Sequence, residues 1–230
     1  GNVLWVGHPM IDLTKKLPLK KEARTILSLR PDQNILLLMP ASRPQELKYI
    51  LPTFMLAARK LQHKYPNLIV YIPSCREVFD ERFKKAFLKY KVKGKVISQK
   101  DNARLKPYIY SLTKIAFCKS GTVNMELALH GIPQIVGYRV SRITAFIAKK
   151  ILNFKVKFIS PVNLLVNKLI IPEFVQSEFD ENKIFYKSCR ILEGKSEKIK
   201  IKKGYSFLKK ELGQEGVVKR AAAEIINSII

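Results

Sequence analysis

Short apolar segments alternate with segments of helical periodicity along most of this chain, and this alternation constrains the fold more than any other feature. Each apolar run has the length of a single buried strand. Strands that alternate with helices are typical of a parallel sheet whose crossover helices cover both faces. We therefore predict an α/β protein with a doubly wound parallel sheet. The predicted strands are residues 35–39, 68–72, 95–98, 115–118, 134–137 and 156–159.

The segments between these strands carry apolar residues at helical spacing. They predict helices over residues 45–65, 77–90, 103–112, 123–130 and 142–152. The strand signals stop after Gln176, and residues 180–192, 205–212 and 215–229 have helical patterns. The charge-rich stretch 195–204 between them is interpreted as a solvated loop. We predict a linker and first helix over 1–34, the α/β domain over 35–178, and a helical extension over 179–230.

The chain is strongly basic, with 43 Lys and Arg residues against 18 Asp and Glu residues and a formal net charge of +25. Such an excess favours an anionic partner, which could be a phosphate-bearing substrate, an anionic membrane surface or a nucleic acid. Lysines far outnumber arginines, although arginine is better suited to bidentate phosphate or base recognition. There is no basic stripe interleaved with aromatic residues, so we expect no nucleic-acid partner.

Several other classes of protein are disfavoured by what the sequence lacks. No stretch has the length and hydropathy of a membrane-spanning helix, and neither a GxGxxG nor a GxxxxGK[ST] motif occurs. We expect no bound metal and no cofactor, and we expect reduced thiols in the cytoplasm, because the cysteines and histidines are scattered. The chain begins at Gly1 in an apolar run, which we interpret as a sign of a fragment. The scattered residues are Cys75, Cys118, Cys189, His8, His63 and His130.

The segment MPASRPQEL follows the first predicted strand and opens a long helix. Ligands of open α/β sheets bind beyond the carboxyl ends of the strands, so this corner is a candidate site. Ser42 and Arg43 offer a hydroxyl and a forked cation to an anion, and Glu46 lies in the first helical turn, where a carboxylate suits the helix dipole. An ordinary serine helix cap beside a surface arginine explains the same residues.

The segment FCKSGTVNMELALHGIP holds a second candidate corner, after the fourth predicted strand. Gly121 allows close backbone approach, and Ser120 and Thr122 place hydroxyls beside the N–H groups of a helix start, which favours a phosphate. Glu126 follows about one turn later, where it can accept hydrogen bonds from ribose hydroxyls. A capped helix of an ordinary α/β protein again remains an alternative.

Taken in order, these motifs resemble the carboxyl-terminal part of lipid-A-disaccharide synthase. The segments WVGHPMID, MPASRPQEL, SGTVNMELAL, GIPQIVGYRVS, SPVNLL and IPEFVQ occur collinearly from about residue 3 to residue 178. The resemblance implies a GT-B glycosyltransferase whose Rossmann-like carboxyl-terminal domain holds the UDP-sugar donor. That family transfers diacylated glucosamine from UDP-2,3-diacylglucosamine to 2,3-diacylglucosamine 1-phosphate, which forms the lipid A disaccharide and releases UDP.

Matching positions carry the family's donor-binding residues onto this sequence. The resemblance assigns substrate binding to Ser42, Arg43, Ser120, Gly121, Thr122, Glu126, Tyr138, Arg139, Asn163 and Gln176. Two positions depart from the family's pattern. Ala41 replaces a glycine and adds a methyl group where backbone approaches phosphate, and Val162 is an extra residue before Asn163.

The family's general base and acceptor site belong to an amino-terminal half that this sequence does not show. We therefore nominate no catalytic residue here, and we expect a hexosyltransferase that is inactive as this fragment alone. Residues 143–158 mix apolar and basic side chains, and family membership implies a peripheral contact there with the anionic inner face of the cytoplasmic membrane. A helix packed on the sheet explains that pattern equally.

Two other functions remain open at the level of sequence. One is a different GT-B enzyme that uses UDP-N-acetylglucosamine, or an epimerase of similar architecture. The other is a non-catalytic basic module that binds anions through charge alone, with an affinity that falls steeply with salt.

Overall fold

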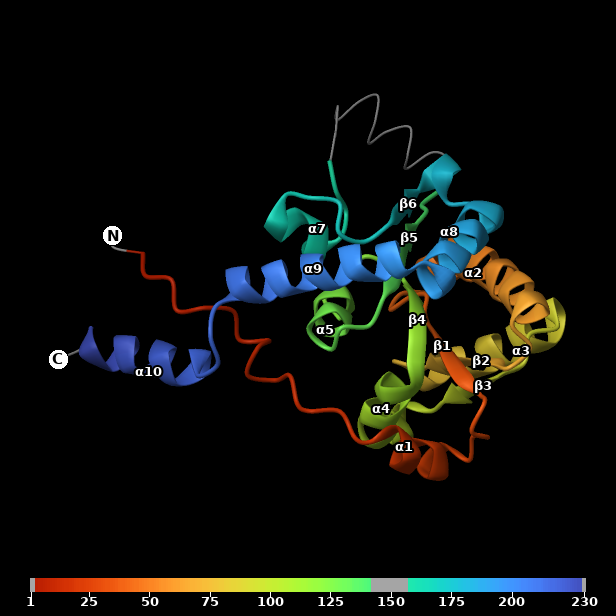
Figure 1. Ribbon diagram of the computed structural model, residues 1–230, viewed down its shortest axis with the longest axis horizontal. Coiled ribbons are helices and arrows are strands. Elements are labelled where there is room, and N and C mark those ends of the chain that lie inside the picture. Colours follow the sequence, from red (N-terminus) through yellow and green to blue (C-terminus); the bar gives the residue numbers. More distant parts are fainter. Residues whose placement is uncertain (1–2, 142–156, 229–230) are drawn as a thin grey trace.

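The computed structural model describes residues 3–141 and 157–228, which form a six-stranded sheet covered by helices (Figure 1). The strand order is β3-β2-β1-β4-β5-β6, and every neighbouring pair is parallel. This confirms the doubly wound α/β fold. The strands are β1 (Asn34–Met39), β2 (Leu68–Pro73), β3 (Gly94–Ile97), β4 (Thr113–Cys118), β5 (Gln134–Tyr138) and β6 (Glu173–Val175).

Helices cover both faces of the sheet, as right-handed crossovers in opposite directions from its centre require. Helices α2 (Pro44–Lys64), α3 (Asp80–Tyr90) and α8 (Glu181–Glu193) pack together on one face. The other face carries α4 (Gln99–Leu112), against which α1 (Lys20–Leu27) packs, and α5 (Val123–Leu129). The remaining helices are α7 (Pro161–Val166), α9 (Lys195–Leu212) and α10 (Val217–Asn227), and short 3-10 turns span Glu77–Phe79 and Gln176–Glu178.

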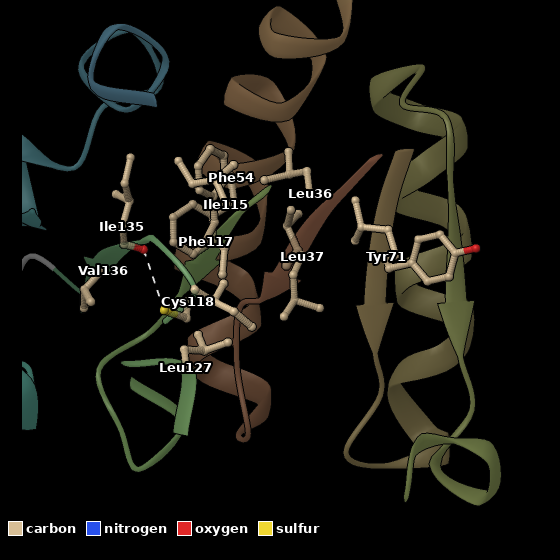
Figure 2. Close-up of a cluster of buried hydrophobic side chains, with 14 of the residues drawn as sticks. Leu36, Leu37, Phe54, Tyr71, Ile115, Phe117, Cys118, Leu127, Ile135 and Val136 are labelled. Atoms are coloured by element: carbon tan, nitrogen blue, oxygen red, sulfur yellow. Dashed lines mark hydrogen bonds between the residues drawn. The ribbon is translucent and has the colours of Figure 1, made fainter. Parts of the chain in front are cut away.

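The core lies between the central strands and the helices that cover them (Figure 2). Phe54 of α2 stacks on Phe117 of β4 with ring centroids 5.4 Å apart and meets the edge of Phe179 at 5.0 Å. Phe179 also covers Gly137 of β5, where an added Cβ would lie 2.1 Å from the phenyl ring. Gly137 is therefore required for close packing in this part of the core.

The first five predicted strands are confirmed within a few residues, but the sixth prediction was wrong. Residues 157–159 form no strand, and the sixth strand is β6. The backbone N–H groups of Ile159 and Ser160 donate to the carboxylate of Glu173, at 2.7 and 2.9 Å, so they take part in a loop and not in a ladder. The helix predicted over 142–152 lies outside the described residues.

The predicted loop over 195–204 was also wrong, because these residues form the first half of α9. Ile201, Tyr205, Leu208 and Leu212 form a buried stripe at helical spacing along that helix. Gly204 lies within the helix, and a Cβ there would come 2.3 Å from Ile170. The glycine thus serves close packing between α9 and the segment after α7.

Asp12 connects the amino-terminal segment to the start of α10. Its two carboxylate oxygens accept hydrogen bonds from the backbone N–H groups of Gly216 (2.7 Å) and Val218 (3.0 Å). The N–H of His8 donates to the carbonyl of Leu212 at 2.9 Å. The amino-terminal segment at His8 and Asp12 therefore lies beside the connection between α9 and α10, away from the sheet (Figure 1).

Candidate functional site

The two candidate corners meet at the carboxyl ends of β1 and β4, which are neighbours in the centre of the sheet. Met39 pairs with Cys118 in the register, and the N–H of Lys119 donates to the carbonyl of Met39 at 3.1 Å. From this point β1 leads into α2 on one face and β4 leads into α5 on the other. Such a switch point opens a crevice at the edge of an α/β sheet, which is where ligands of these folds bind.

The carboxylate of Glu46 joins the two corners directly. Its Oε2 atom accepts hydrogen bonds from the backbone N–H groups of Ser42 (2.9 Å) and Arg43 (3.1 Å). Its Oε1 atom lies 2.8 Å from Nζ of Lys119 on the other corner. The side chains of Lys119 and Glu46 are only 19% and 13% exposed, so this ion pair is largely shielded from water.

The electrostatics of Glu46 favour its charged form. Burial raises the pKa of this carboxyl, but hydrogen bonds from Lys119 and from the Ser42 N–H outweigh that effect and leave the pKa below its ordinary value. The sequence assignment missed Lys119 as a member of the site. A lysine directly after a buried strand, at the binding edge of the sheet, was the available signal.

The Ser-Gly-Thr turn forms the second corner. The hydroxyl of Ser120 donates to the carbonyl of Ile159, and the N–H of Gly121 donates to Oδ1 of Asn124 at 2.8 Å. Gly121 does not have a positive φ, and an added Cβ would have Lys119 Cε, at 3.9 Å, as its nearest neighbour. Neither the backbone nor the packing of the described residues therefore explains a glycine at this position.

Glu126 lies on α5, with a side chain that is 26% exposed. Its Oε1 atom is 2.6 Å from Nζ of Lys106 on α4. The structure thus places this carboxylate beside a cation of the preceding helix, and it shows no contact between Glu126 and the first corner.

Tyr138, Arg139 and Gln176 form a second group, at the carboxyl ends of β5 and β6. Tyr138 pairs with Val175 in the register. The guanidinium of Arg139 donates to the carbonyl of Gln176, at 3.3 and 3.2 Å, and to the carbonyl of Phe179. Its Cζ atom lies 5.2 Å from the centre of the Phe179 ring. Arg139 thereby holds the turn at Gln176, whose φ of 53° is in the left-handed region.

Asn163 is fully buried on α7, and its side chain holds the loop that leads to β6. Its Nδ2 donates to the carbonyl of Ile171 (2.8 Å) and to Glu173 (2.7 Å). Its Oδ1 accepts from the N–H groups of Ile170 (2.8 Å) and Ile171 (3.0 Å). The amide faces this loop and not solvent.

The described part of the chain contains no group of three His, Cys, Asp or Glu side chains arranged to hold a metal ion, and none of its helices is long and apolar enough to cross a membrane.

The sheet order and the two corners at its centre define a class: a Rossmann-like domain of the type found in GT-B glycosyltransferases. A family model for lipid-A-disaccharide synthetase matches residues 2–229. The chain belongs to this family.

Curated relatives agree with the family match. Lipid-A-disaccharide synthase of Prochlorococcus marinus (strain MIT 9313) is 44% identical over 227 residues, which cover 99% of this chain and 58% of the relative. The synthase of Synechocystis sp. (strain ATCC 27184 / PCC 6803 / Kazusa) is 33% identical over 226 residues, which cover 98% of this chain and 56% of the relative. The chain thus spans somewhat more than half the length of these relatives.

Solved structures with the same fold are much more distant in sequence. The S. aureus MnaA–UDP co-structure superposes with a TM-score of 0.62 at 12% identity, over 97% of this chain and 54% of that one. WaaG, a glycosyltransferase involved in lipopolysaccharide biosynthesis, gives a TM-score of 0.58 at 13% identity, over 95% of this chain and 54% of that one. These similarities establish the fold.

Proposed function

We propose that this chain is the UDP-sugar-binding part of a lipid-A-disaccharide synthase. The complete enzyme would transfer diacylated glucosamine from UDP-2,3-diacylglucosamine to 2,3-diacylglucosamine 1-phosphate and release UDP. Family membership supports this reaction. The chain spans 58% of the length of its relative from Prochlorococcus marinus. We therefore propose the transfer reaction for the complete enzyme and donor binding for this chain.

The observation that carries the donor site is the space at Gly121. A side chain there would project into space at the switch point where, among the described residues beyond its two chain neighbours, only Lys119 Cε lies within 4 Å. Glycine is favoured where backbone must come close to a ligand, and the described residues around Gly121 give no other reason for it. We assign this space to the diphosphate of the donor.

Charged and hydroxyl groups around this space support the assignment. Ser42 and Arg43 are exposed at the end of β1, and Thr122 is exposed on the opposite corner. Arg43 supplies a permanently charged fork for phosphate oxygens, and Lys119 supplies a second cation. Glu126 remains our candidate for the ribose hydroxyls.

Arg139 and Asn163 have a positioning role in this proposal. Arg139 and Asn163 are engaged with backbone groups of their own loops, so they would shape the sugar side of the site and not contact the donor themselves. Tyr138 and Gln176 remain candidates for direct contact with the donor.

The proposed membrane contact falls on residues 143–158, of which only Lys157 and Phe158 are described. The acylated acceptor and a cytoplasmic site of action on the inner membrane face are inferences from family membership.

Calorimetric titration of this chain with UDP tests the proposal, with ADP as the control ligand and with low and moderate salt concentrations. Selective, saturable binding of UDP that survives added salt is the expected result. Equal binding of UDP and ADP, with an affinity that falls steeply with salt, would leave only a basic anion-binding surface.

A further inference from the structure

Three buried polar side chains form a continuous hydrogen-bonded connection between α9 and the Ser-Gly-Thr turn. Asn124 and Gln134 have no exposed surface, and Tyr205 is 3% exposed. They come from α5, β5 and α9, so the connection crosses three elements. Buried polar groups are costly unless they are paired, and each of these side chains is paired.

Asn124 holds the turn from inside. Its Oδ1 atom accepts the hydrogen bond from the N–H of Gly121 at 2.8 Å. Its Nδ2 atom donates to the carbonyl of Lys119 at 3.2 Å, to Sγ of Cys118 at 3.1 Å and to Oε1 of Gln134 at 3.1 Å. One amide therefore fixes the residues on both sides of Ser120.

Gln134 and Tyr205 hold Asn124 in turn. Nε2 of Gln134 donates to the backbone carbonyl of Asn124 at 2.9 Å and to the hydroxyl of Tyr205 at 3.1 Å. The Tyr205 hydroxyl donates to the carbonyl of Ile132 at 2.9 Å. The oxygen and the nitrogen of the Gln134 side-chain amide both have partners, so the amide has a single orientation.

We propose that Asn124 is a positioning residue of the donor site, and that Tyr205 of α9 fixes its orientation through Gln134. This inference rests on the proposed function, because it takes the turn at Gly121 as the seat of the UDP diphosphate. The amide of Asn124 sets where the backbone of Lys119 and Gly121 lies. A turn held in place before the ligand arrives loses less conformational entropy on binding.

The test compares two variants with a matched control. Asn124→Ala removes the acceptor for the Gly121 N–H. Tyr205→Phe removes only a hydroxyl on α9, a helix that is remote from the turn in the sequence. Tyr71→Phe removes another buried hydroxyl, one that has no hydrogen-bond partner in the described structure. Tyr71 lies on β2, and its hydroxyl points away from Cys118 (Figure 2). Each variant of the 230-residue chain is assayed for UDP affinity, thermal unfolding and amide hydrogen exchange at Gly121.

We expect Asn124→Ala to weaken UDP binding about tenfold and Tyr205→Phe about threefold, which are the effects of losing one or part of one hydrogen bond. Both variants should speed amide exchange at Gly121, whereas Tyr71→Phe should change neither quantity. If Asn124→Ala does not fold, Tyr205→Phe decides the question. Lower melting temperatures with unchanged UDP affinity and Gly121 exchange would overturn the proposal, because they indicate a purely structural network.

The wild-type titration separates this inference from the proposed function. If the wild type does not bind UDP, the proposed function fails and the positioning role fails with it. If the wild type binds UDP and the Tyr205→Phe variant binds it equally well with normal Gly121 exchange, the role of Tyr205 is overturned when Asn124→Ala folds and weakens UDP binding, and the whole proposal is overturned when Asn124→Ala does not fold.

Discussion

Lys119 and Glu46 form an ion pair across the centre of the sheet edge, with Nζ of the lysine 2.8 Å from Oε1 of the carboxylate. The two residues come from different corners, which are separated in the sequence by β2 and β3. Glu46 also accepts hydrogen bonds from the backbone N–H groups of Ser42 and Arg43, so a single carboxylate is bonded to both corners.

Replacing this carboxylate should reduce stability in a pH-dependent way. We expect Glu46→Gln to lower the free energy of unfolding by about 1 to 3 kcal/mol at pH 7, the range for hydrogen bonds to charged groups. The pKa of Glu46 is lower in the folded state than its ordinary value, so its stabilisation is complete above about pH 4.3 and is lost as the pH falls through the folded pKa. Urea titrations at pH 7 and pH 3 check this. A difference between variant and wild type that is the same at both pH values would contradict the ion-pair explanation.

Two glycine substitutions should separate binding from packing. Gly121→Ala places a methyl group where the described residues leave room for it, so we expect normal stability and UDP binding that is weaker by about tenfold or more. Gly137→Ala drives a methyl group into Phe179 and should cost about 2 to 3 kcal/mol of stability. Thermal unfolding and UDP titration of both variants are the measurements. Unchanged UDP affinity in Gly121→Ala would remove the main support for the donor site.

Arg43 should contribute to UDP affinity and not to stability, because its side chain is exposed. We expect Arg43→Ala to lose about 1.5 to 3 kcal/mol of UDP binding free energy. Arg82→Ala, at an exposed position on α3, is the matched control for the loss of one positive charge. Calorimetry on both variants at one salt concentration is decisive: equal losses would indicate a general charge effect.

Asn163, in contrast to Arg43, should contribute to stability and not to UDP affinity. We expect Asn163→Leu to destabilise the fold by about 3 kcal/mol, because the backbone groups of Ile170 and Ile171 lose their buried partners. Below the melting temperature the variant should keep most of its UDP affinity. Normal stability together with lost UDP binding would instead assign Asn163 to direct donor contact.

The sequence was informative where local pattern and burial agree. The apolar runs of β1, β2, β4 and β5 predicted the sheet, because strands buried on both faces are continuously apolar. Strand β6 was missed because its three residues are half-buried and begin with Glu173, whose carboxylate is used by a loop. The apolar stretch before Ser160 was mistaken for that strand.

The amino-terminal half of α9 was missed for a different reason. Its lysines and Gly204 have the composition of a loop, and the buried stripe emerges only when Ile201 is read together with Tyr205 and Leu208. The glycine is explained by Ile170, a residue on a distant segment, so local sequence could not distinguish packing from flexibility.

The sequence predicted which residues lie at the site, but it did not predict which of them bond to one another. Motif order identified Ser42, Arg43 and the Ser-Gly-Thr turn, which the structure brings to adjacent strand ends. Lys119 is paired with Glu46, 73 residues away, and Gln134, which holds the Asn124 amide, is itself bonded to Tyr205, 71 residues further along the chain. Such pairings are set by tertiary packing, which the spacing of residues along one segment does not encode.

The position of β1 in the sheet also affects how the protein is made. Strand β1 is synthesised before its central neighbour β4, which follows only after two further strands and three helices. Until then the apolar residues of β1 have one partner strand at most, and an unpaired edge is exposed to other chains. The order of synthesis therefore makes the nascent protein dependent on protection from aggregation until the chain has passed Cys118, the last residue of β4.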